Sequence, residues 1–196
     1  MDYAAAIVIG YILGSIPVAL LVARRHGVDL PAVGDGNPGA WNALEQLGAR
    51  RAWPAFAGDG AKGLLAGLAG HALGGSWWVA FAAVAAAMAG HAFPLFARFR
   101  GGKAVMTFVG GGFALAPLAA LIALAVCVVV TAAASFAWGA RAGVFGFPAI
   151  QLAVDDTERV IAMGGLMCLI GALFGLARLR RRSAPATAAQ VAPPTT

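Results

Sequence analysis

The chain has 196 residues, of which 61% are hydrophobic and only 11% charged, and its mean hydropathy is +0.82. This composition lies outside the range of soluble domains and is typical of a protein that resides in a lipid bilayer. The length allows one compact domain, and a net charge of +6 without a basic soluble domain argues against a nucleic-acid-binding protein.

Five stretches are apolar enough to cross a membrane, for which about 20 residues are needed. The fourth is too long for one upright helix, and Gly110, Gly111, Gly112 and Pro117 are candidate break points. With the apolar run 142–154, it would supply one further pair of crossings. We therefore predict an all-α integral membrane protein, a polytopic bundle of about 5–7 transmembrane helices. The five stretches are 4–23, 53–73, 77–97, 104–138 and 160–177.

Basic residues gather after the first, third and last stretches. In contrast, the segment 74–76 carries no charged residue, and the segment 155–159 carries more acidic than basic residues. Short loops rich in Lys and Arg stay on the cytoplasmic side. The pattern predicts an N-terminus outside and a C-terminus in the cytoplasm. It also predicts a single polytopic membrane domain over 1–182 and a disordered cytoplasmic tail over 183–196. The basic residues are Arg24, Arg25, Arg50, Arg51, Arg98, Arg100, Lys103, Arg178, Arg180, Arg181 and Arg182.

The sequence GDGNPGAWN, residues 34–42, forms the first of three polar clusters on the predicted cytoplasmic face. Its glycines allow successive backbone amides to point into one concavity that holds an anion, and Asn37 and Asn42 are further donors. Asp35 opposes an anion, since a carboxylate about 4 Å from a phosphate costs about 4 kcal/mol per charge pair at an effective dielectric of 20. A metal, a nearby cation or protonation would have to offset it. The alternative is a re-entrant turn that caps the next helix.

The second cluster is GDGAKG, residues 58–63, within the second stretch. Asp59 and Lys62 lie three residues apart, on one helical face, and form either a plain intramembrane ion pair or part of a site. Gly63 and Gly67 form a GxxxG pattern that favours close helix packing.

The third cluster is GHAFPLFARFRGGKAVMT, residues 90–107. Lys103 and Thr107, four residues apart, would share a helix face, with Gly101 and Gly102 exposing amides at the helix start as a phosphate cradle. His91 is a candidate base or donor, and the alternative is a structural hydrogen bond. Cys127 and Cys168 lie in apolar runs and indicate neither a disulfide nor a metal site.

Together with GSIP at 14–17, these motifs resemble, in order and spacing, those of the bacterial membrane acyl-phosphate:glycerol-3-phosphate acyltransferases of the PlsY type. The resemblance covers about the first 110 residues. It implies a multi-pass helical enzyme of the bacterial inner (plasma) membrane, which uses no metal or cofactor. The implied reaction transfers an acyl chain from acyl phosphate to the 1-hydroxyl of glycerol 3-phosphate and gives lysophosphatidic acid.

The resemblance also implies roles for single residues. Lys103 with Gly101 and Gly102 would hold a phosphate, the loop residues would shape the site, and Asp59 and Lys62 would support it. The candidate catalytic residues are Lys103, Asp35 and His91, and the candidate substrate- or phosphate-binding residues are Asn37, Gly39, Asn42, Asp59, Lys62, Gly101, Gly102 and Thr107.

The chain departs from the family pattern at several motif positions. Pro31 and Glu45 replace arginines, Asp35 replaces a serine, Trp41 a threonine and Ala104 a glycine, and the C-terminal HRxNIxRL motif has no counterpart. Three hypotheses follow, favoured in this order. The first is a working acyltransferase, the second a non-catalytic homologue that binds lipid or a partner, and the third a small transporter with Asp59 and Lys62 as pathway charges.

Overall fold

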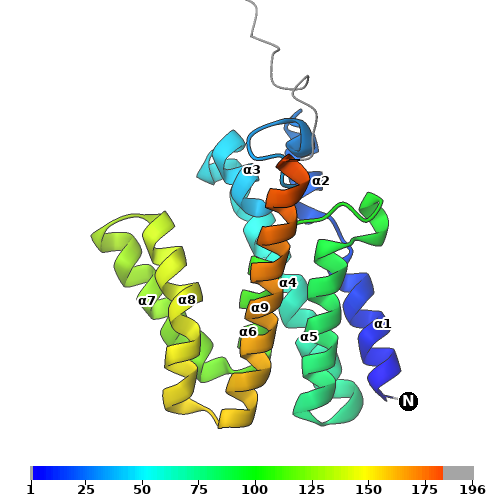
Figure 1. The fold of residues 1–196 in the computed structure, drawn as a ribbon, viewed down its shortest axis with the longest axis vertical. Coiled ribbons are helices and arrows are strands. Elements are labelled where there is room, and N and C mark those ends of the chain that lie inside the picture. The colour runs from blue at the N-terminus through cyan, green and yellow to red at the C-terminus, as the bar shows by residue number, and fades with distance from the viewer. Residues whose placement is uncertain (1, 183–196) are drawn as a thin grey trace, which may run out of the picture.

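The computed structural model describes residues 2–182, and every regular element among them is helical. Long helices run along the axis of a bundle, and short elements cap one end of it (Figure 1). The all-α membrane class predicted from the sequence is confirmed. The bundle consists of α1 (Asp2–Gly14), α4 (Ala49–Gly74), α5 (Trp77–Ala92), α6 (Val105–Leu115), α7 (Pro117–Ala133), α8 (Phe136–Val154) and α9 (Thr157–Arg182). The cap consists of α2 (Val18–Arg25), η1 (Leu30–Ala32), α3 (Ala40–Leu47) and η2 (Leu95–Ala97).

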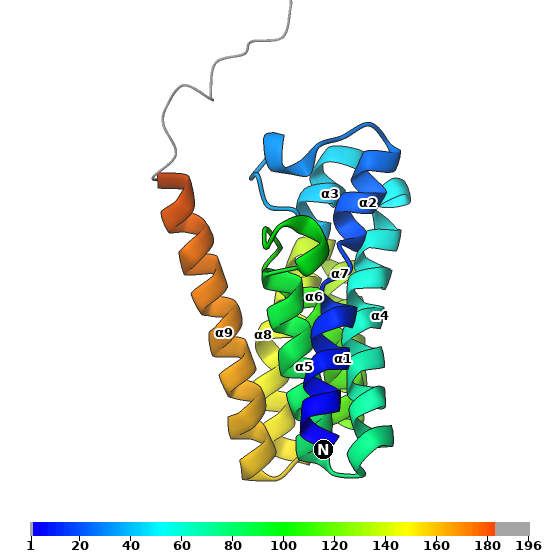
Figure 2. The ribbon, with the colours of Figure 1, turned by 90° about the vertical axis from the view of Figure 1, so that its right-hand side faces the viewer.

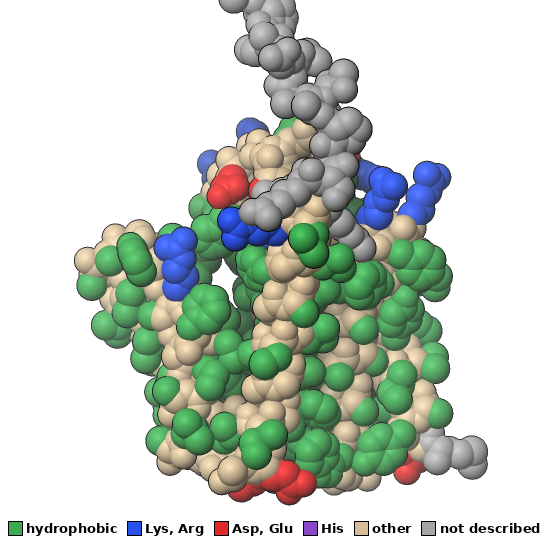
Figure 3. Space-filling model, in the orientation of Figure 1, with side chains coloured by type: hydrophobic (Ala, Val, Ile, Leu, Met, Phe, Trp, Pro, Cys, Tyr) green, Lys and Arg blue, Asp and Glu red, His purple; other side chains and the backbone are tan. Residues whose placement is uncertain are grey.

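Among residues 2–182, three helical segments are long and apolar enough to cross a membrane, namely Asp2–Arg25, Trp77–Ala97 and Thr157–Leu179, and α6 and α7 are shorter apolar helices. The chain begins at the lower end of the bundle, and α9 ends at the upper, capped end (Figures 1 and 2). On the face shown in Figure 3, the Lys and Arg side chains lie in the upper half, and acidic side chains gather at the lower edge where α8 meets α9. Placement of the upper end in the cytoplasm stays a prediction, and the tail predicted over 183–196 lies outside the described residues.

Two of the predicted spans are interrupted at prolines. The span expected over 4–23 ends as α1 at Gly14, and α2 starts only after Pro17. The stretch 104–138 breaks at Ala116, and Pro117 is the first residue of α7, a position where its missing N–H costs nothing. Gly110, Gly111 and Gly112, also expected as break points, lie inside α6. The run 142–154 lies in α8, which packs against α7 as a helical hairpin, and the additional pair of crossings considered for this region stays a prediction.

Small residues bring α4 and α6 into backbone contact. A Cβ on Gly63 would collide with the carbonyl of Thr107, and a Cβ on Gly110 would collide with the carbonyl of Gly60. The close packing predicted from the GxxxG pattern is therefore present, and it places Asp59 and Lys62 of α4 beside the first turn of α6.

Candidate functional site

Asn42 organises the loop between η1 and α3. Its side chain is 1% exposed, and Nδ2 donates to the backbone carbonyls of Leu30, Val33 and Asn37, each at 3.1 Å. Within the loop, Gly34 and Gly36 adopt positive φ angles of 58° and 65°, which glycine reaches at little cost. The amide nitrogen of Asn42 is thus occupied inside the loop, and its contacts are those of a structural residue.

Asp35 joins this loop to the connection between α5 and α6. One carboxylate oxygen, Oδ1, accepts from the backbone N–H of Asn37 at 2.9 Å, and the other, Oδ2, accepts from Lys103 Nζ at 3.1 Å. The side chains of Lys103 and Asp35 are 16% and 29% exposed, so the ion pair is partly reached by solvent. A metal, a nearby cation or protonation was expected to offset the Asp35 charge, and the structure shows the nearby cation, which is Lys103.

Asn37 and Gly39 are neighbours at the start of α3. Gly39 is the N-cap residue of α3, and a Cβ at this position would lie 2.7 Å from Asn37 Nδ2. Glycine here lets the Asn37 side chain lie against the helix start. Both residues therefore shape the end of the loop, as the resemblance implied for the loop as a whole.

Lys103 precedes α6 instead of lying on it. Ala104 has φ 58° in the left-handed region, and α6 begins at Val105. The expected shared helix face of Lys103 and Thr107 is therefore wrong, because the backbone reverses its handedness between them. Thr107 is fully buried, and its Oγ1 has no hydrogen-bond partner among the described residues.

The backbone amides of Gly101 and Gly102 form hydrogen bonds with the end of α5. They donate to the carbonyls of Ala92 at 3.2 Å and His91 at 3.1 Å, so the expectation of exposed amides at these two positions is wrong. A Cβ on Gly102 would collide with His91 Nε2, which shows that glycine is needed here for close packing. The first intrahelical bond of α6 runs from Phe108 N to Ala104 O, which leaves the amides of the preceding turn, 105–107, without an intrahelical acceptor.

Asp59, Lys62 and His91 form a buried polar cluster one layer below this surface. Lys62 Nζ lies 2.9 Å from Asp59 Oδ1 and donates to the carbonyl of Ile16 at 3.1 Å. That carbonyl lies in the break between α1 and α2 and also accepts from the backbone amide of Val18 at 3.0 Å. His91 Nδ1 lies 3.6 Å from the same Asp59 oxygen. The cluster ties α4 to the α1–α2 break and to the end of α5.

A small cavity of about 10 Å³ lies over this cluster, with room for about one water molecule. Arg100, an exposed residue, lines it together with Lys62, Gly101 and Gly102. The sequence pattern assigned Arg100 only to the basic residues that indicate membrane orientation. Its position directly before the two glycines of RGGK is the signal that points to the site. Among residues 2–182, no three His, Cys, Asp or Glu side chains gather in a way that could hold a metal ion.

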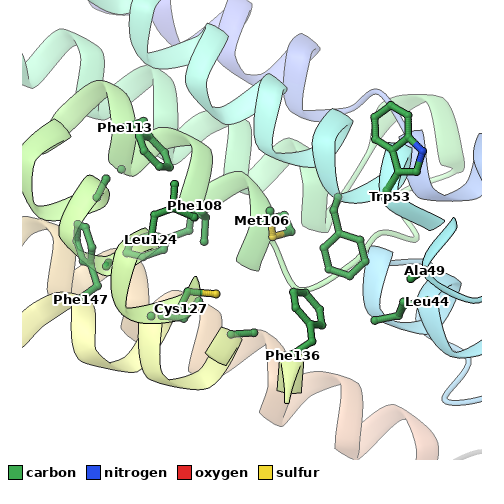
Figure 4. Close-up of a pocket in the computed structure, with 18 residues that line it drawn as sticks. Leu44, Ala49, Trp53, Met106, Phe108, Phe113, Leu124, Cys127, Phe136 and Phe147 are labelled. Atoms are coloured by element: carbon green, nitrogen blue, oxygen red, sulfur yellow. The ribbon is translucent and has the colours of Figure 1, made fainter. Parts of the chain in front are cut away.

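A much larger cavity of about 520 Å³ lies between α4, α6, α7 and α8, and its lining is apolar (Figure 4). Leu44, Ala49 and Trp53 line one end of it, and Phe113 and Phe147 line the other (Figure 4). Met106, three residues after Lys103, contributes to the wall. This volume falls within the about 300–1,000 Å³ typical of ligand pockets.

Aromatic side chains close the rim of this cavity near the loop. Phe136 stacks on Trp41, with ring centroids 5.9 Å apart, and meets Phe56 edge to face at 5.8 Å. Trp41 also donates from Nε1 to Glu45 Oε1 at 2.8 Å. Two of the departures from the family pattern, Trp41 and Glu45, thus bond to each other and join α3 to α8.

These features define an integral membrane protein with a lysine-bearing polar site at one end of the bundle and an apolar cavity beside it. A sequence profile of the glycerol-3-phosphate acyltransferase family matches residues 4–184. The chain belongs to this family.

Relatives agree with the assignment. The glycerol-3-phosphate acyltransferase of Geobacter sulfurreducens is 36% identical over 166 residues, which cover 84% of each chain. That of Rubrobacter xylanophilus is 45% identical over 111 residues, 57% of this chain and 56% of the relative, so this alignment spans little more than half of either protein.

Solved structures of PlsY (YgiH), an integral membrane glycerol 3-phosphate acyltransferase, share the fold. Its glycerol 3-phosphate form is 28% identical with a TM-score of 0.75, covering 92% of this chain and 90% of that one. Its lysophosphatidic acid form is 26% identical with a TM-score of 0.75, covering 94% and 95%.

Proposed function

We propose that the chain transfers an acyl chain from acyl phosphate to glycerol 3-phosphate and so makes lysophosphatidic acid at the bacterial inner membrane. The observation that carries the proposal is the juxtaposition of Lys103 with the apolar cavity, because a lipid-like donor needs a cation for its phosphate and an apolar space for its chain. Lys103 precedes the first turn of α6, and Met106 of that turn lines the cavity.

The donor binds with its phosphate at Lys103 and its acyl chain in the cavity. The unpaired amides of the first turn of α6 add donors and the positive end of a helix dipole. Each CH₂ group moved from water into the cavity contributes about 0.8 kcal/mol, and one that moves in from the equally apolar bilayer core contributes much less. The phosphate takes over the Lys103 ammonium from Asp35, which leaves the Asp35 carboxylate beside the reacting groups.

The acceptor hydroxyl then attacks the carbonyl carbon of the donor. A new C–O ester bond forms, the bond between the carbonyl carbon and the phosphate oxygen breaks, and inorganic phosphate leaves. Asp35 accepts the hydroxyl proton and passes it to the departing phosphate, and Lys103 with the α6 amides stabilises the charge that collects on that phosphate. Arg100, exposed at the small cavity, binds the phosphate of glycerol 3-phosphate.

The remaining candidate residues hold the loop, the α5–α6 connection and the helices of the site in place. Asn42, Asn37 and Gly39 fix the loop that carries Asp35. Gly101, Gly102 and His91 fix the connection that carries Lys103, and Asp59, Lys62 and Thr107 hold the helices beneath it. The match of the family profile to nearly the whole described chain favours the acyltransferase over the non-catalytic homologue and the transporter.

The test is an assay of the full chain in liposomes with acyl phosphate and glycerol 3-phosphate, following lysophosphatidic acid and inorganic phosphate. We expect both products in equal amounts, and neither when one substrate is omitted. Asp35→Asn should lower kcat by about a hundredfold, the lower range for loss of a general base. A rise in kcat/KM for Asp35→Asn would show that the carboxylate only competes with the phosphate. Absence of turnover in a folded protein would favour the non-catalytic homologue.

A further inference from the structure

Phe174 of α9 lies against the ammonium of Lys103. The distance from Lys103 Nζ to the centre of the Phe174 ring is 4.4 Å, within the about 6 Å range of a cation–π contact. Phe174 is 47% exposed, so it is not held there by burial in the core. The contact joins the last helix of the bundle to the polar site.

α9 packs on the core along one side only. Its buried side chains, Met163, Leu166, Ile170 and Leu173, lie on one side toward the core. A Cβ added at Gly171 or Gly175 would meet nothing within 4 Å, and Figure 2 shows α9 standing apart from the rest of the bundle. Among the α9 side chains that the structure describes, the ring of Phe174 contacts Lys103.

We propose that Phe174 is a positioning residue that holds the Lys103 ammonium for an anionic phosphate. The inference rests on the proposed function in taking that phosphate to be the donor's. An ammonium has three N–H donors, and Asp35 uses one of them. The ring face attracts the charge without neutralising it and without requiring a hydrogen bond. The other donors of Lys103 therefore remain available to the ligand.

This contact matters most when the phosphate replaces Asp35. A lysine side chain is flexible, and holding it in one geometry costs conformational entropy. The ion pair with Asp35 restrains Lys103 until a phosphate binds, and this restraint is lost when the phosphate replaces Asp35 at the ammonium. Phe174 restrains the side chain in both states, so α9 contributes to the site through an apolar ring.

The test compares Phe174→Leu, which removes the ring, with Phe174→Tyr, which keeps it. Phe145→Leu on α8 is the matched control, because Phe145 is 71% exposed and belongs to no site described above. We expect Phe174→Leu to lower kcat/KM for acyl phosphate about 2- to 30-fold, the range that cation–π contacts support. KM for glycerol 3-phosphate should change little, and Phe174→Tyr should restore the wild-type value.

Titration of the same variants with inorganic phosphate gives a readout that needs no turnover. Phe174→Leu should weaken binding by the same factor, and Lys103→Ala marks complete loss of the contact. If the wild type shows no turnover but phosphate binding follows this pattern, the proposed function fails and the role of Phe174 stands. The proposal is overturned if Phe174→Leu binds phosphate like the wild type, or if Phe174→Tyr is as weak as Phe174→Leu.

Discussion

Replacement of Lys62 by methionine tests whether the buried cluster is structural. The side chains of Lys62 and Asp59 are 5% and 2% exposed and lie 2.9 Å apart. Lys62→Met leaves the Asp59 carboxylate without its cation, and the Ile16 carbonyl keeps the Val18 amide as a donor but loses the Lys62 ammonium. Removing one partner of a buried ion pair costs about 3–5 kcal/mol. At about 2–4 °C per kcal/mol for a chain of this size, the melting temperature should fall by about 6–20 °C.

The assay is thermal unfolding in one fixed detergent, followed by circular dichroism, with turnover measured on the same samples. Arg159→Met is the matched control, because Arg159 and Asp156 form an ion pair of the same spacing whose side chains are 43% and 55% exposed. An exposed pair contributes about 0–1 kcal/mol, so this variant should melt close to the wild type. The double variant with Asp59→Asn and Lys62→Met should recover part of the loss. If Lys62→Met melts like the wild type but has no turnover, Lys62 contacts substrate and the structural interpretation is refuted.

Three further predictions concern the loop, the turn before α6 and the cavity. Asn42→Ala should destabilise the protein by about 1–3 kcal/mol in thermal unfolding, because buried carbonyls lose their donor; an unchanged melting temperature would contradict the role of Asn42. Ala104→Gly should stay within about 1 kcal/mol of wild type, since relief of about 1–2 kcal/mol of left-handed strain offsets a lost methyl worth about 0.8 kcal/mol. Ala104→Val should melt well below both, and equal stability of the two variants would argue against a left-handed Ala104. Phe147→Ala enlarges the far end of the cavity and should shift the donor preference toward longer acyl chains in competition assays; an unchanged preference would place the chain elsewhere.

The sequence predicted the parts of the fold that depend on local hydropathy. Apolar stretches and basic loops indicated the helical membrane class, and Pro117 marked a real helix break. The break after α1 was missed because the hydrophobic run continues through Pro17 without a change of composition. The proline itself was the available signal, since a helix interior rarely accommodates it without a kink.

The sequence identified several residues of the candidate site, but it did not predict how these residues contact one another. Asp35 and Lys103 were identified, but the ion pair between them depends on how the loop and the α5–α6 connection meet. The phosphate cradle was assigned to Gly101 and Gly102, whose amides bond to the end of α5, because a glycine pair gives no sign of where its amides point. Phe174 and the apolar cavity depend on the packing of α9 and of the α7–α8 hairpin, which no local pattern specifies.

The central claim is that Lys103 binds the phosphate of an acyl phosphate donor during acyl transfer. The most direct measurement compares the rate of lysophosphatidic acid formation by the wild type and by Lys103→Ala in liposomes, with the fold of both checked by circular dichroism. The account predicts turnover by the wild type and its loss in a folded Lys103→Ala variant. Equal rates for the two proteins would contradict it.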